Sequence, residues 1–561
     1  MKASFNWLNE FVDIELTPAK IADAMTMAGL EVESVEEIGP EFHGVIIARI
    51  LTIDKHPNAD RLALCTLNSG EEAAHQIVCG AKNIAVGQRV PLALPGAMLP
   101  GGMKIKRTKI RGVESGGMIC SEVELGLGED KSGIMILADD APLGTELGDY
   151  LGLKDFIFDI GVTPNRSDCF GILGIARDIA AITGKKLKKR TASLPDPGNL
   201  NIAELISVEN AAPSFCGRYS AMMIEGVTVG PSPLWLSRRL ALHGIRAVNN
   251  VVDVTNYVML EYSQPLHAFD YDLIEGRKIT VRTGGEGDSI ETIDGSKAPI
   301  TSDIPVIADD AGPVAIAGVM GGKRSEISEA TRNILIECAF FNAGTVRMVS
   351  KSLGIASESS FRFERGVDIE AVNVVINRAA ELILKVGGGT LANGAIDIYP
   401  ERYKLVQIAL SQERVNALLG TALTMTTIKE SLNSVGIATK SAKEGESIIA
   451  EPPSYRPDIG MEADLIEEVA RLTSYENIPS TLPKGAITPY TIGRPRKIKG
   501  VAREILTNLG LYEVINYSFV GEDAARVDGS ESGSGIRLLN PLSEEQVLLR
   551  SHLFPSLLGN L

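Results

Sequence analysis

The stretch TPNRSDCFGILGIARDIAAITGKKL, residues 163–187, joins a polar turn to an apolar helix. Ser167 or Asp168 is predicted to cap the N-terminus of this helix, because a short polar side chain there can accept a backbone N–H. Apolar residues then recur at helical spacing as far as Gly184, where the helix is expected to end. A helix this apolar predicts packing against a hydrophobic core.

The chain around this helix is too long for one core. Its 561 residues predict roughly three to five domains of about 100–200 residues each. Hydrophobic residues make up 44% and charged residues 22%, which is typical of soluble globular proteins. With 56 glycines and only 5% aromatic residues, the composition favours β-rich modules over a helical bundle. The predicted fold class is multidomain α+β.

Changes in hydrophobic pattern predict five domains. An N-terminal α/β segment, formed by 1–39 and 151–195, is expected to carry an inserted barrel at 40–150. The barrel is indicated by short β runs such as GVIIARILTID (44–54) and QRVPLALPGAML (88–99), which Gly and Pro separate. A large α/β domain follows at 205–400 and a small helical domain at 404–480. A last domain begins near 485 and is incomplete at 561.

Charge and cysteine usage exclude several classes of protein. The net charge is −16 and the pI about 5.1, whereas proteins that coat nucleic acid are usually basic, so any RNA contact must use local basic patches. Six scattered cysteines without a C-x-x-C pair predict free thiols in the cytosol. The N-terminus has no apolar h-region and no stretch reaches 18 apolar residues, so neither a signal peptide nor a membrane span is expected.

One basic segment lies inside the predicted barrel. Five cations occur within eight residues without an acidic residue: Lys104, Lys106, Arg107, Lys109 and Arg111. Alternating cations on a strand can follow a phosphate backbone, although most charge runs are solvated surface. Small five-stranded barrels of the OB-fold type often bind oligonucleotides on one face. Together with HPNADRLALC (56–65), the segment resembles the tRNA-binding barrel of synthetase-associated proteins.

The large domain contains two polar residues of interest. Glu337 lies within the apolar run ILIECAFF and is predicted to be buried, which requires an Arg or a ligand as partner. His267 has no Cys, His or carboxylate at metal-ligand spacing, so a hydrogen-bonded core or surface role is the simpler interpretation. AGVMGGKRS (317–325) does not match the phosphate-binding loop, because Ala317 and Arg324 stand where Gly and Ser or Thr are required.

An acidic cluster marks the small domain. Asp464, Glu467 and Glu468 are spaced i, i+3 and i+4, which puts them on one helix face, and Asp458 precedes the helix. Four oxygen donors at this density suit Mg²⁺ or Ca²⁺. The alternative is a solvated acidic first turn that the helix dipole favours.

These strings, of which 163–187 is the most specific, resemble the beta subunits of bacterial phenylalanine–tRNA ligases over essentially the whole chain. The resemblance implies a cytoplasmic complex that uses ATP to attach phenylalanine to tRNA(Phe), with the aminoacylation site on an alpha subunit. Two alpha and two beta chains are expected to form a heterotetramer. The beta chain is expected to bind tRNA and to hydrolyse mischarged tyrosyl-tRNA(Phe).

The resemblance makes 205–400 the editing domain. Residues that match the family's editing pocket are Thr255, Asn256, His267, Gly321 and Glu337, together with Ser357 and Ser359. Glu337 is expected to accept the tyrosyl hydroxyl, and Gly321 to let the substrate approach the backbone. His267, Thr255 and Asn256 are expected to orient the ester and a hydrolytic water. A pocket that hydrogen-bonds this hydroxyl rejects phenylalanine, since its own polar group would be left unpaired.

The resemblance also assigns the acidic cluster. Asp458, Asp464, Glu467 and Glu468 match the family's ligands for one Mg²⁺ per beta subunit, a structural ion at the contact with the alpha subunit. The segment after 485 is similar to the start of an antiparallel, class II synthetase-like domain that lacks a working active site. Family members continue beyond it, so the chain is expected to be shortened at its C-terminus.

Two other functions are compatible with the residues. A non-catalytic tRNA-binding adaptor would use only the barrel at 40–150 and would leave Glu337 and His267 as packing residues. A metal-dependent hydrolase would use the carboxylates from Asp458 to Glu468 as its active site.

Overall fold

The computed structural model describes residues 1–71, 73–128, 131–188, 190–442, 447–483, 485–486, 490–523 and 535–561. These divide into two compact units, Met1–Pro479 and Ser480–Leu561. The architecture is mixed α+β with several separate sheets. All six cysteines are buried free thiols, as predicted. Among the helices in the described ranges, none has the length and apolarity needed to cross a bilayer.

The N-terminal region is a small sheet covered by helices. Strand β11 (Asp155–Gly161) lies between β1 (Lys2–Ser4) and β2 (Glu31–Ile38), so the sheet joins the beginning of the chain to a segment beyond the barrel. Helices α1 (Phe5–Phe11), α2 (Pro18–Met27) and α4 (Ile172–Thr183) contribute apolar side chains to its core.

Helix α4 is the apolar helix predicted from 163–187, and it ends at Gly184 in the left-handed conformation as expected. The predicted N-cap is wrong. Gly171 stands at that position, while Ser167 and Asp168 lie in the preceding 3₁₀ turn η2 (Ser167–Phe170). The Asp168 side chain accepts hydrogen bonds from Arg166 instead of capping the helix.

The barrel region is a curled antiparallel sheet in the order β10-β6-β3-β4-β5, with β7 paired to β6. Its strands are β3 (His43–Lys55), β4 (Ala63–Asn68), β5 (His75–Cys79), β6 (Arg89–Leu99), β7 (Met103–Lys104) and β10 (Met118–Ile119). The two end strands of the sheet, β10 and β5, approach each other. Just before β10, the N–H of Gly116 donates to the carbonyl of Gln76 on β5 at 2.8 Å. A hairpin of β8 (Thr108–Ile110) and β9 (Val113–Ser115) lies beside them.

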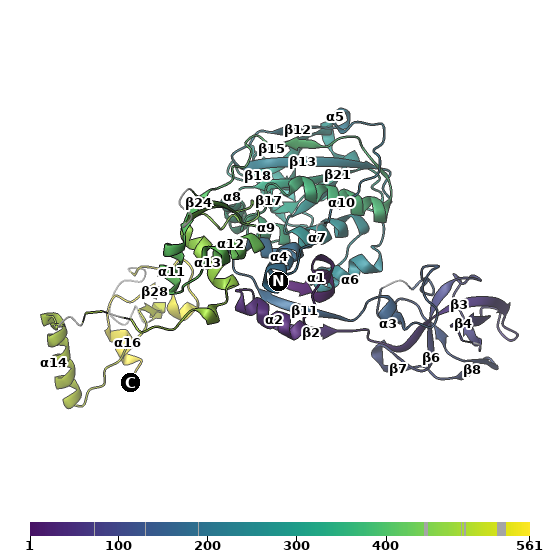
Figure 1. Ribbon diagram of the computed structural model, residues 1–561, viewed down its shortest axis with the longest axis horizontal. Coiled ribbons are helices and arrows are strands. Elements are labelled where there is room, and N and C mark those ends of the chain that lie inside the picture. Colours follow the sequence, from purple (N-terminus) through teal and green to yellow (C-terminus); the bar gives the residue numbers. More distant parts are fainter. Residues whose placement is uncertain are drawn as a thin grey trace. The chain divides into compact units, whose positions relative to one another are not determined.

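Three layers form the large α/β domain, as Figure 1 shows. An outer sheet has the order β12-β15-β18-β19-β20, and an inner sheet the order β14-β21-β13-β22 with β23 paired to β13. Helices α6 (Leu234–Leu242), α7 (Asn250–Tyr262) and α10 (Val372–Gly387) cover the other face of the inner sheet. The outer strands are β12 (Ser207–Asn210), β15 (Lys278–Thr283), β18 (Pro305–Asp309), β19 (Gly312–Ile316) and β20 (Met320–Gly321). The inner strands are β13 (Cys216–Glu225), β14 (Leu266–Asp270), β21 (Ile334–Phe341), β22 (Thr390–Leu391) and β23 (Ile396–Ile398).

The inner sheet is buried on both faces. Side chains of β21 alternate between them, so that Ile334, Ile336 and Cys338 pack on the helices. Leu335 and Ala339 pack toward the outer sheet. This explains the continuous apolar run ILIECAFF, since a strand covered on both faces has no solvent side for polar residues.

The small domain, 408–472, packs α11 (Gln412–Leu419), α12 (Met425–Ser434) and α13 (Glu462–Leu472) on a three-stranded sheet. The strand order is β24-β26-β25, formed by Ile408–Ser411, Ser447–Glu451 and Ala438–Ser441. Helix α13 turns Leu465, Ile466 and Val469 into this core.

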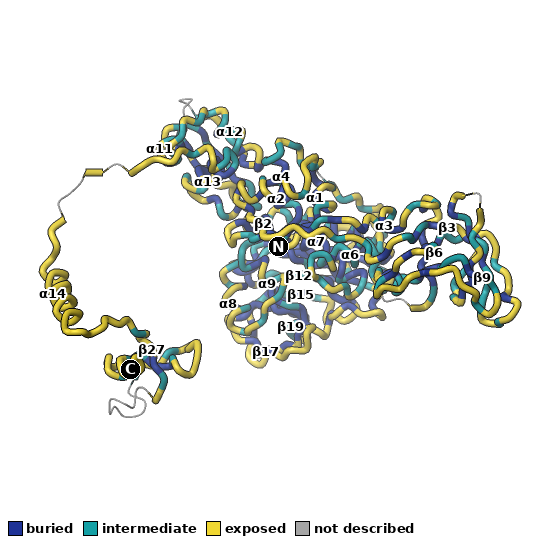
Figure 2. Tube along the Cα trace, turned by 90° about the horizontal axis from the view of Figure 1, so that it is seen from below, coloured by how far each residue is buried: buried dark blue, intermediate teal, exposed yellow. Residues whose placement is uncertain are grey.

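The second unit contains α14 (Arg494–Asn508), a short pair of β27 (Phe519–Val520) with β28 (Leu548–Leu549), and α16 (Phe554–Leu558). Its one small core cluster consists of Val520, Val547 and Leu548 within the described residues. Figure 2 shows α14 exposed along its length.

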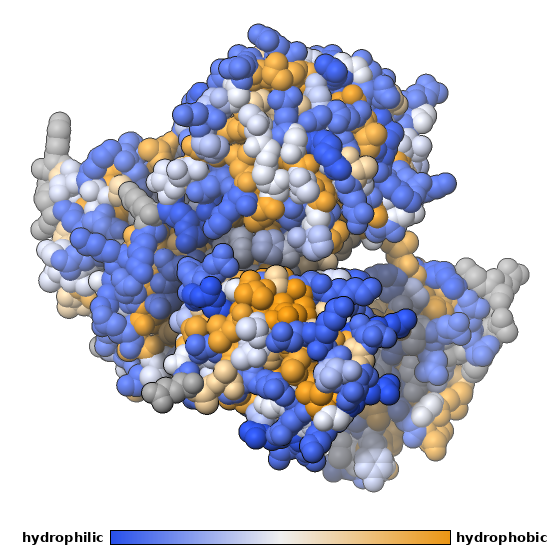
Figure 3. Space-filling view, turned by 90° about the vertical axis from the view of Figure 1, so that its right-hand side faces the viewer, coloured by the Kyte–Doolittle hydropathy of each residue, from blue (hydrophilic) through white to orange (hydrophobic). Residues whose placement is uncertain are grey.

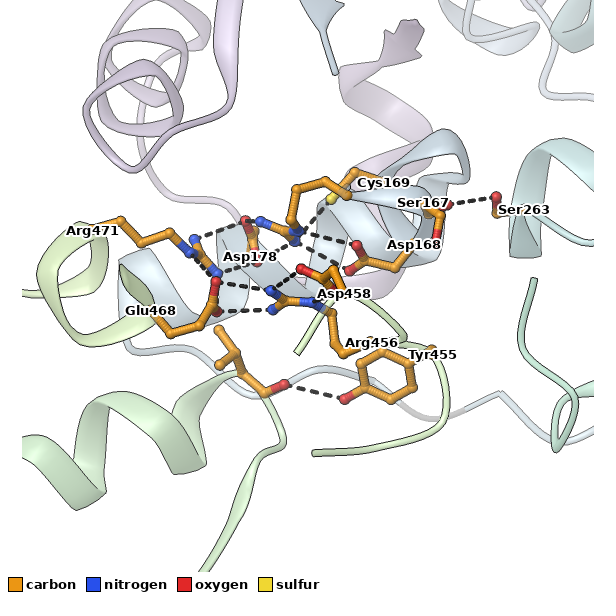
Figure 4. A network of polar contacts seen from close by, with 12 residues as sticks. Ser167, Asp168, Cys169, Asp178, Ser263, Tyr455, Arg456, Asp458, Glu468 and Arg471 are labelled. Atoms are coloured by element: carbon orange, nitrogen blue, oxygen red, sulfur yellow. Dashed lines mark hydrogen bonds and ion pairs between the residues drawn. The ribbon is translucent and has the colours of Figure 1, made fainter. Parts of the chain in front are cut away.

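A buried ion-pair chain joins α4 and η2 to α13 (Figure 4). It alternates carboxylate and guanidinium groups in the order Asp168, Arg166, Asp178, Arg471, Glu468, Arg456 and Asp458. Arg471 donates to both oxygens of Glu468 at 2.8 and 2.7 Å and to Asp178 Oδ2 at 3.0 Å. Each arginine therefore bonds two carboxylates, and bidentate contacts of this kind are the strong ones.

Two carboxylates of this ion-pair chain, Glu468 and Asp168, are held in the ionised form. Burial by itself would raise the pKa of Glu468, but the hydrogen bonds from Arg456 and Arg471 outweigh it and hold that pKa well below its usual range. Burial is likewise outweighed at Asp168, where Arg166 lowers the pKa. Every carboxylate and guanidinium in this contact between the N-terminal region and the small domain has an ion-pair partner.

We predict that the stability of the protein depends on the buried Glu468 and not on the exposed Glu467 beside it. Glu468→Ala is expected to lower the free energy of unfolding by about 3 kcal/mol, because two buried guanidiniums each lose a carboxylate. Glu467→Ala, an exposed change on the same helix, is expected to stay within about 0.5 kcal/mol. Urea unfolding measures both values when it is followed by the fluorescence of Trp7, which is buried in the core that α4 shares, and of Trp235, which packs against that core. Equal losses in the two variants would contradict this account.

Candidate functional site

A small, partly open cavity of about 50 Å³ lies between the inner and outer sheets. The polar side chains on its wall are His267, Glu337 and Ser359, and Gly321 contributes backbone. Strands β14, β21 and β20 and helix α9 (Glu358–Phe363) supply these four residues. The structure thus brings together four of the residues predicted for one pocket, from positions almost 100 residues apart.

Glu337 is buried, as its apolar surroundings in the sequence predict, with 5% of its surface exposed. Its partner among the described residues is a tyrosine and not an arginine. The hydroxyl of Tyr219 on β13 donates to Glu337 Oε2 at 2.9 Å. Burial raises the pKa of Glu337 to about 8, against a smaller lowering by this hydrogen bond. The carboxyl is therefore largely protonated at neutral pH.

His267 stands directly opposite Glu337 in the pairing of β14 with β21. Burial lowers the pKa of His267 to about 4, so its imidazole is neutral at pH 7. Its Nε2 atom is buried and has no hydrogen-bond partner in the described part of the chain. The ring packs edge-on against Phe269, with centroids 4.5 Å apart. His267 thus contributes to the cavity wall a neutral imidazole whose Nε2 has no partner among the described residues.

Gly321 is required by the position of His267. A Cβ atom at residue 321 would lie 2.4 Å from His267 Cε1, closer than real Cβ contacts occur. The backbone of β20 and the imidazole could therefore not keep this approach with any side chain at 321. The family resemblance explains a glycine at 321 by the approach of the substrate to the backbone. The structure adds a second explanation, which is the close packing of the His267 ring against residue 321.

The other three residues predicted for the pocket, Ser357, Thr255 and Asn256, do not line the cavity. Ser357 caps α9 and donates its hydroxyl to the Val319 carbonyl at 2.6 Å, so it holds the cavity wall from behind. Thr255 and Asn256 lie on α7, the helix that covers the other face of the inner sheet, and neither lines the cavity. The Thr255 hydroxyl donates to the Val252 carbonyl within its own helix at 2.7 Å. Their parts in catalysis stay predictions.

A groove of about 880 Å³ on the barrel receives part of the basic segment. Lys104 and Lys106 line it, together with Lys82, Lys131 and the apolar Met103. The five cations do not share one strand, because β7 ends at Lys104 and β8 begins at Thr108. The other three cations, Arg107, Lys109 and Arg111, are exposed outside the groove wall. Figure 3 shows the side of the molecule that faces right in Figure 1, with apolar and polar side chains intermixed.

The four predicted metal ligands do not converge. Asp458 and Glu468 both bond Arg456, and Asp464 Oδ2 accepts the N–H groups of Gly460 and Met461 at 2.8 Å. Glu467 is exposed to solvent. No three carboxylate, histidine or cysteine side chains among the described residues are placed to share a metal ion. As arranged, this donor set does not fit Mg²⁺, which requires about six oxygens in octahedral geometry.

Four family models match successive parts of the chain. The "Putative tRNA binding domain" matches residues 45–146, and the "B3/4 domain" matches 215–388. The "tRNA synthetase B5 domain" matches 408–475, and the "Phenylalanyl tRNA synthetase beta chain CLM domain" matches 478–561.

Curated relatives match over the whole chain. Proteins named phenylalanine–tRNA ligase beta subunit from Syntrophus aciditrophicus and Moorella thermoacetica are 47% and 45% identical to it, and the one from Geobacter sulfurreducens is 44% identical. Each alignment covers 100% of this chain and 70% of the relative. An N-terminal fragment of the phenylalanyl-tRNA synthetase beta-subunit from Pyrococcus horikoshii covers 84% of this chain and 99% of its own, at 11% identity and a TM-score of 0.37, too distant to support a structural argument.

The resemblance inferred from 163–187 and the strings around it is thereby confirmed. An identity of 40–47% along all of the residues is far above what a shared fold alone would produce. The chain belongs to the family of phenylalanine–tRNA ligase beta subunits.

Proposed function

We propose that this chain serves a phenylalanine–tRNA ligase in two ways: it binds tRNA(Phe) through its barrel, and it hydrolyses tyrosyl-tRNA(Phe) at the cavity around Glu337. The complex would attach phenylalanine to tRNA(Phe) with ATP in the cytoplasm, at a site on an alpha subunit. Two alpha and two beta chains would form the working heterotetramer. The buried carboxyl of Glu337 on the cavity wall is the observation that carries the hydrolytic assignment.

The environment of Glu337 suits recognition of a phenol. A protonated carboxyl can donate to the oxygen of a tyrosyl hydroxyl and can accept from its proton. Phenylalanine offers neither group and would leave the buried acid without a partner, which costs free energy on binding. Neutral His267, beside it, is placed to accept a proton from a water molecule near the ester.

The size of the cavity limits how the substrate enters. At about 50 Å³ it is well below the roughly 300–1,000 Å³ of pockets that enclose a whole small molecule. Only the tip of a ligand fits as the side chains stand, so a phenol ring enters when a lining side chain moves. Met320, which lines the cavity and is unbranched, is suited to such a movement.

The adaptor alternative makes Glu337 a packing residue. A purely structural strand would be more stable with an apolar residue at this position, because burying a carboxyl costs free energy even when it is protonated. The presence of Glu337, His267 and the closely packed Gly321 on one cavity favours chemistry over packing.

We also propose the domain assignment that goes with this function. Residues 1–39 with 151–195 form the N-terminal domain, and 40–150 form a tRNA-binding OB-fold barrel. Residues 205–400 form the editing domain and 404–480 the small domain. The described residues after 485 belong to the start of a class II synthetase-like domain.

The hydrolytic assignment predicts a loss of selectivity. Glu337→Ala in the full chain is expected to lower the preference for tyrosyl- over phenylalanyl-tRNA(Phe) by roughly 10- to 100-fold, because the hydroxyl loses its partner. Deacylation of the two charged tRNAs by the purified chain measures this ratio. Glu326→Ala, an exposed change in the same domain, is the matched control. If Glu337→Ala keeps the wild-type ratio, the assignment is wrong.

The raised pKa of Glu337 predicts a pH-dependent stability. Its ordinary value is 4.5 and its folded value about 8, so the folded state binds a proton that the unfolded state has lost between these limits. The stabilisation is complete below pH 4.5 and disappears as the pH rises toward 8. The melting temperature of the wild type should therefore fall relative to Glu337→Gln between pH 5 and pH 8, measured by scanning fluorimetry with Glu326→Gln as control. A constant difference would contradict the assignment of this pKa.

The groove predicts that the cations inside it contribute more to tRNA binding than those outside it. Replacing Lys104 and Lys106 together by Ala is expected to weaken tRNA(Phe) binding and to reduce the slope of log K against log salt by about two. Lys109→Ala with Arg111→Ala, which removes the same charge outside the groove, should have a smaller effect. Filter binding over a salt series measures both slopes. Equal effects of the two pairs would show that the groove does not guide the RNA.

A further inference from the structure

Glu337 lies between two aromatic side chains on adjacent strands. His267 faces it directly from β14, and Tyr219 reaches it diagonally from β13, where Ala339 is the residue opposite Tyr219. All three point to the same face of the inner sheet, because cross-strand partners and their i, j±2 neighbours share a face. His267 and Glu337 line the cavity, whereas Tyr219 lies behind them and is fully buried.

The Tyr219 hydroxyl fixes one of the two carboxyl oxygens. It donates to Oε2 at 2.9 Å, and no second donor to this carboxyl is found in the described part of the chain. The tyrosine ring is packed in the core between the two sheets, so its hydroxyl has little freedom to move. Burial, followed by the proximity of Glu337, holds the pKa of Tyr219 well above its ordinary value, so the phenol stays a donor.

Tyr219 presents to Glu337 the same chemical group that a tyrosyl substrate would present. A carboxyl has two oxygens and can bond two phenols, one on each. With Oε2 taken by Tyr219, Oε1 is left for a group in the cavity. Without this bond the terminal torsion of the glutamate would be broad, and either oxygen could face the cavity or the core.

We propose that Tyr219 is a positioning residue for hydroxyl recognition: by bonding Oε2 it directs Oε1 of Glu337 to the cavity, and so sets the preference for a phenolic over an unsubstituted aromatic side chain. The inference rests on the proposed hydrolysis of tyrosyl-tRNA(Phe). It assigns Tyr219 a part in selectivity and none in bond cleavage, because Tyr219 does not line the cavity.

The test is Tyr219→Phe in the full chain, which keeps the ring and removes the hydroxyl. The ratio of kcat/KM for tyrosyl- over phenylalanyl-tRNA(Phe) is expected to fall roughly five- to tenfold, the effect of one hydrogen bond. The loss should come from a higher KM for the tyrosyl substrate, with kcat nearly unchanged. Tyr271→Phe is the matched control, because its hydroxyl bonds the Leu205 carbonyl at 2.7 Å in the same domain and away from the cavity.

A double-mutant cycle separates positioning from general destabilisation. If Tyr219 acts through Glu337, Tyr219→Phe has no further effect on the ratio when added to Glu337→Ala. A wild-type ratio in Tyr219→Phe, or equal losses with both charged tRNAs, overturns the role of Tyr219 while Glu337→Ala still loses selectivity. A wild-type ratio in Glu337→Ala overturns the proposed site itself, and the role of Tyr219 with it.

Discussion

The packing of the first unit depends on a buried chain of alternating carboxylates and guanidiniums. Each ion in it would cost several kcal/mol to bury alone, so the chain is tolerable only when every member has its partners. It connects Asp178 to Arg471 across 293 residues of sequence and thereby fixes α4 against α13. The same contacts hold turn η2, whose Ser167 carbonyl accepts the Ser263 hydroxyl at 2.9 Å at the end of α7. Strand β14, which carries His267, begins three residues later.

Two buried glutamates in this protein show how surroundings decide chemistry. Glu468 has two guanidiniums, which outweigh burial, and its carboxyl stays ionised as a structural link. Glu337 has only a phenol, burial dominates, and its carboxyl is protonated at neutral pH. The first arrangement leaves no oxygen free for a ligand, whereas the second keeps a neutral acid on a cavity wall. The ionised Glu468 therefore links two parts of the fold, whereas the neutral acid of Glu337 lies on the cavity where we propose recognition.

Local pattern in the sequence predicted what depends on local contacts. The apolar helix ending at Gly184 and the burial of Glu337 within ILIECAFF both follow from spacing and hydrophobicity. The predicted N-cap is wrong because the Asp168 carboxylate bonds Arg166 instead of capping the helix. The basic segment is divided between β7, which ends at Lys104, and β8, which begins at Thr108, and its part in tRNA binding stays a prediction. The sequence did contain a sign that the acidic residues pair with arginines instead of a metal ion. Arg456 lies two residues before Asp458, and Arg471 lies three residues after Glu468. The sequence contains no comparable sign of the bond between Tyr219 and Glu337, because the two residues are 118 positions apart and meet only through the pairing of β13 with β21.

A protonated carboxyl would also distinguish tyrosine from phenylalanine better than an ionised carboxylate. An ionised carboxylate at the cavity would stay strongly solvated, and a hydroxyl would have to compete with water for it. A protonated carboxyl between two sheets is only weakly solvated, so a phenol adds a hydrogen bond that phenylalanine cannot supply. Any nearby arginine would ionise Glu337 and remove this difference, as Arg456 and Arg471 do at Glu468. The proposed selectivity for tyrosine therefore requires that the ion-pair chain and the neutral Glu337 stay on different elements of the fold.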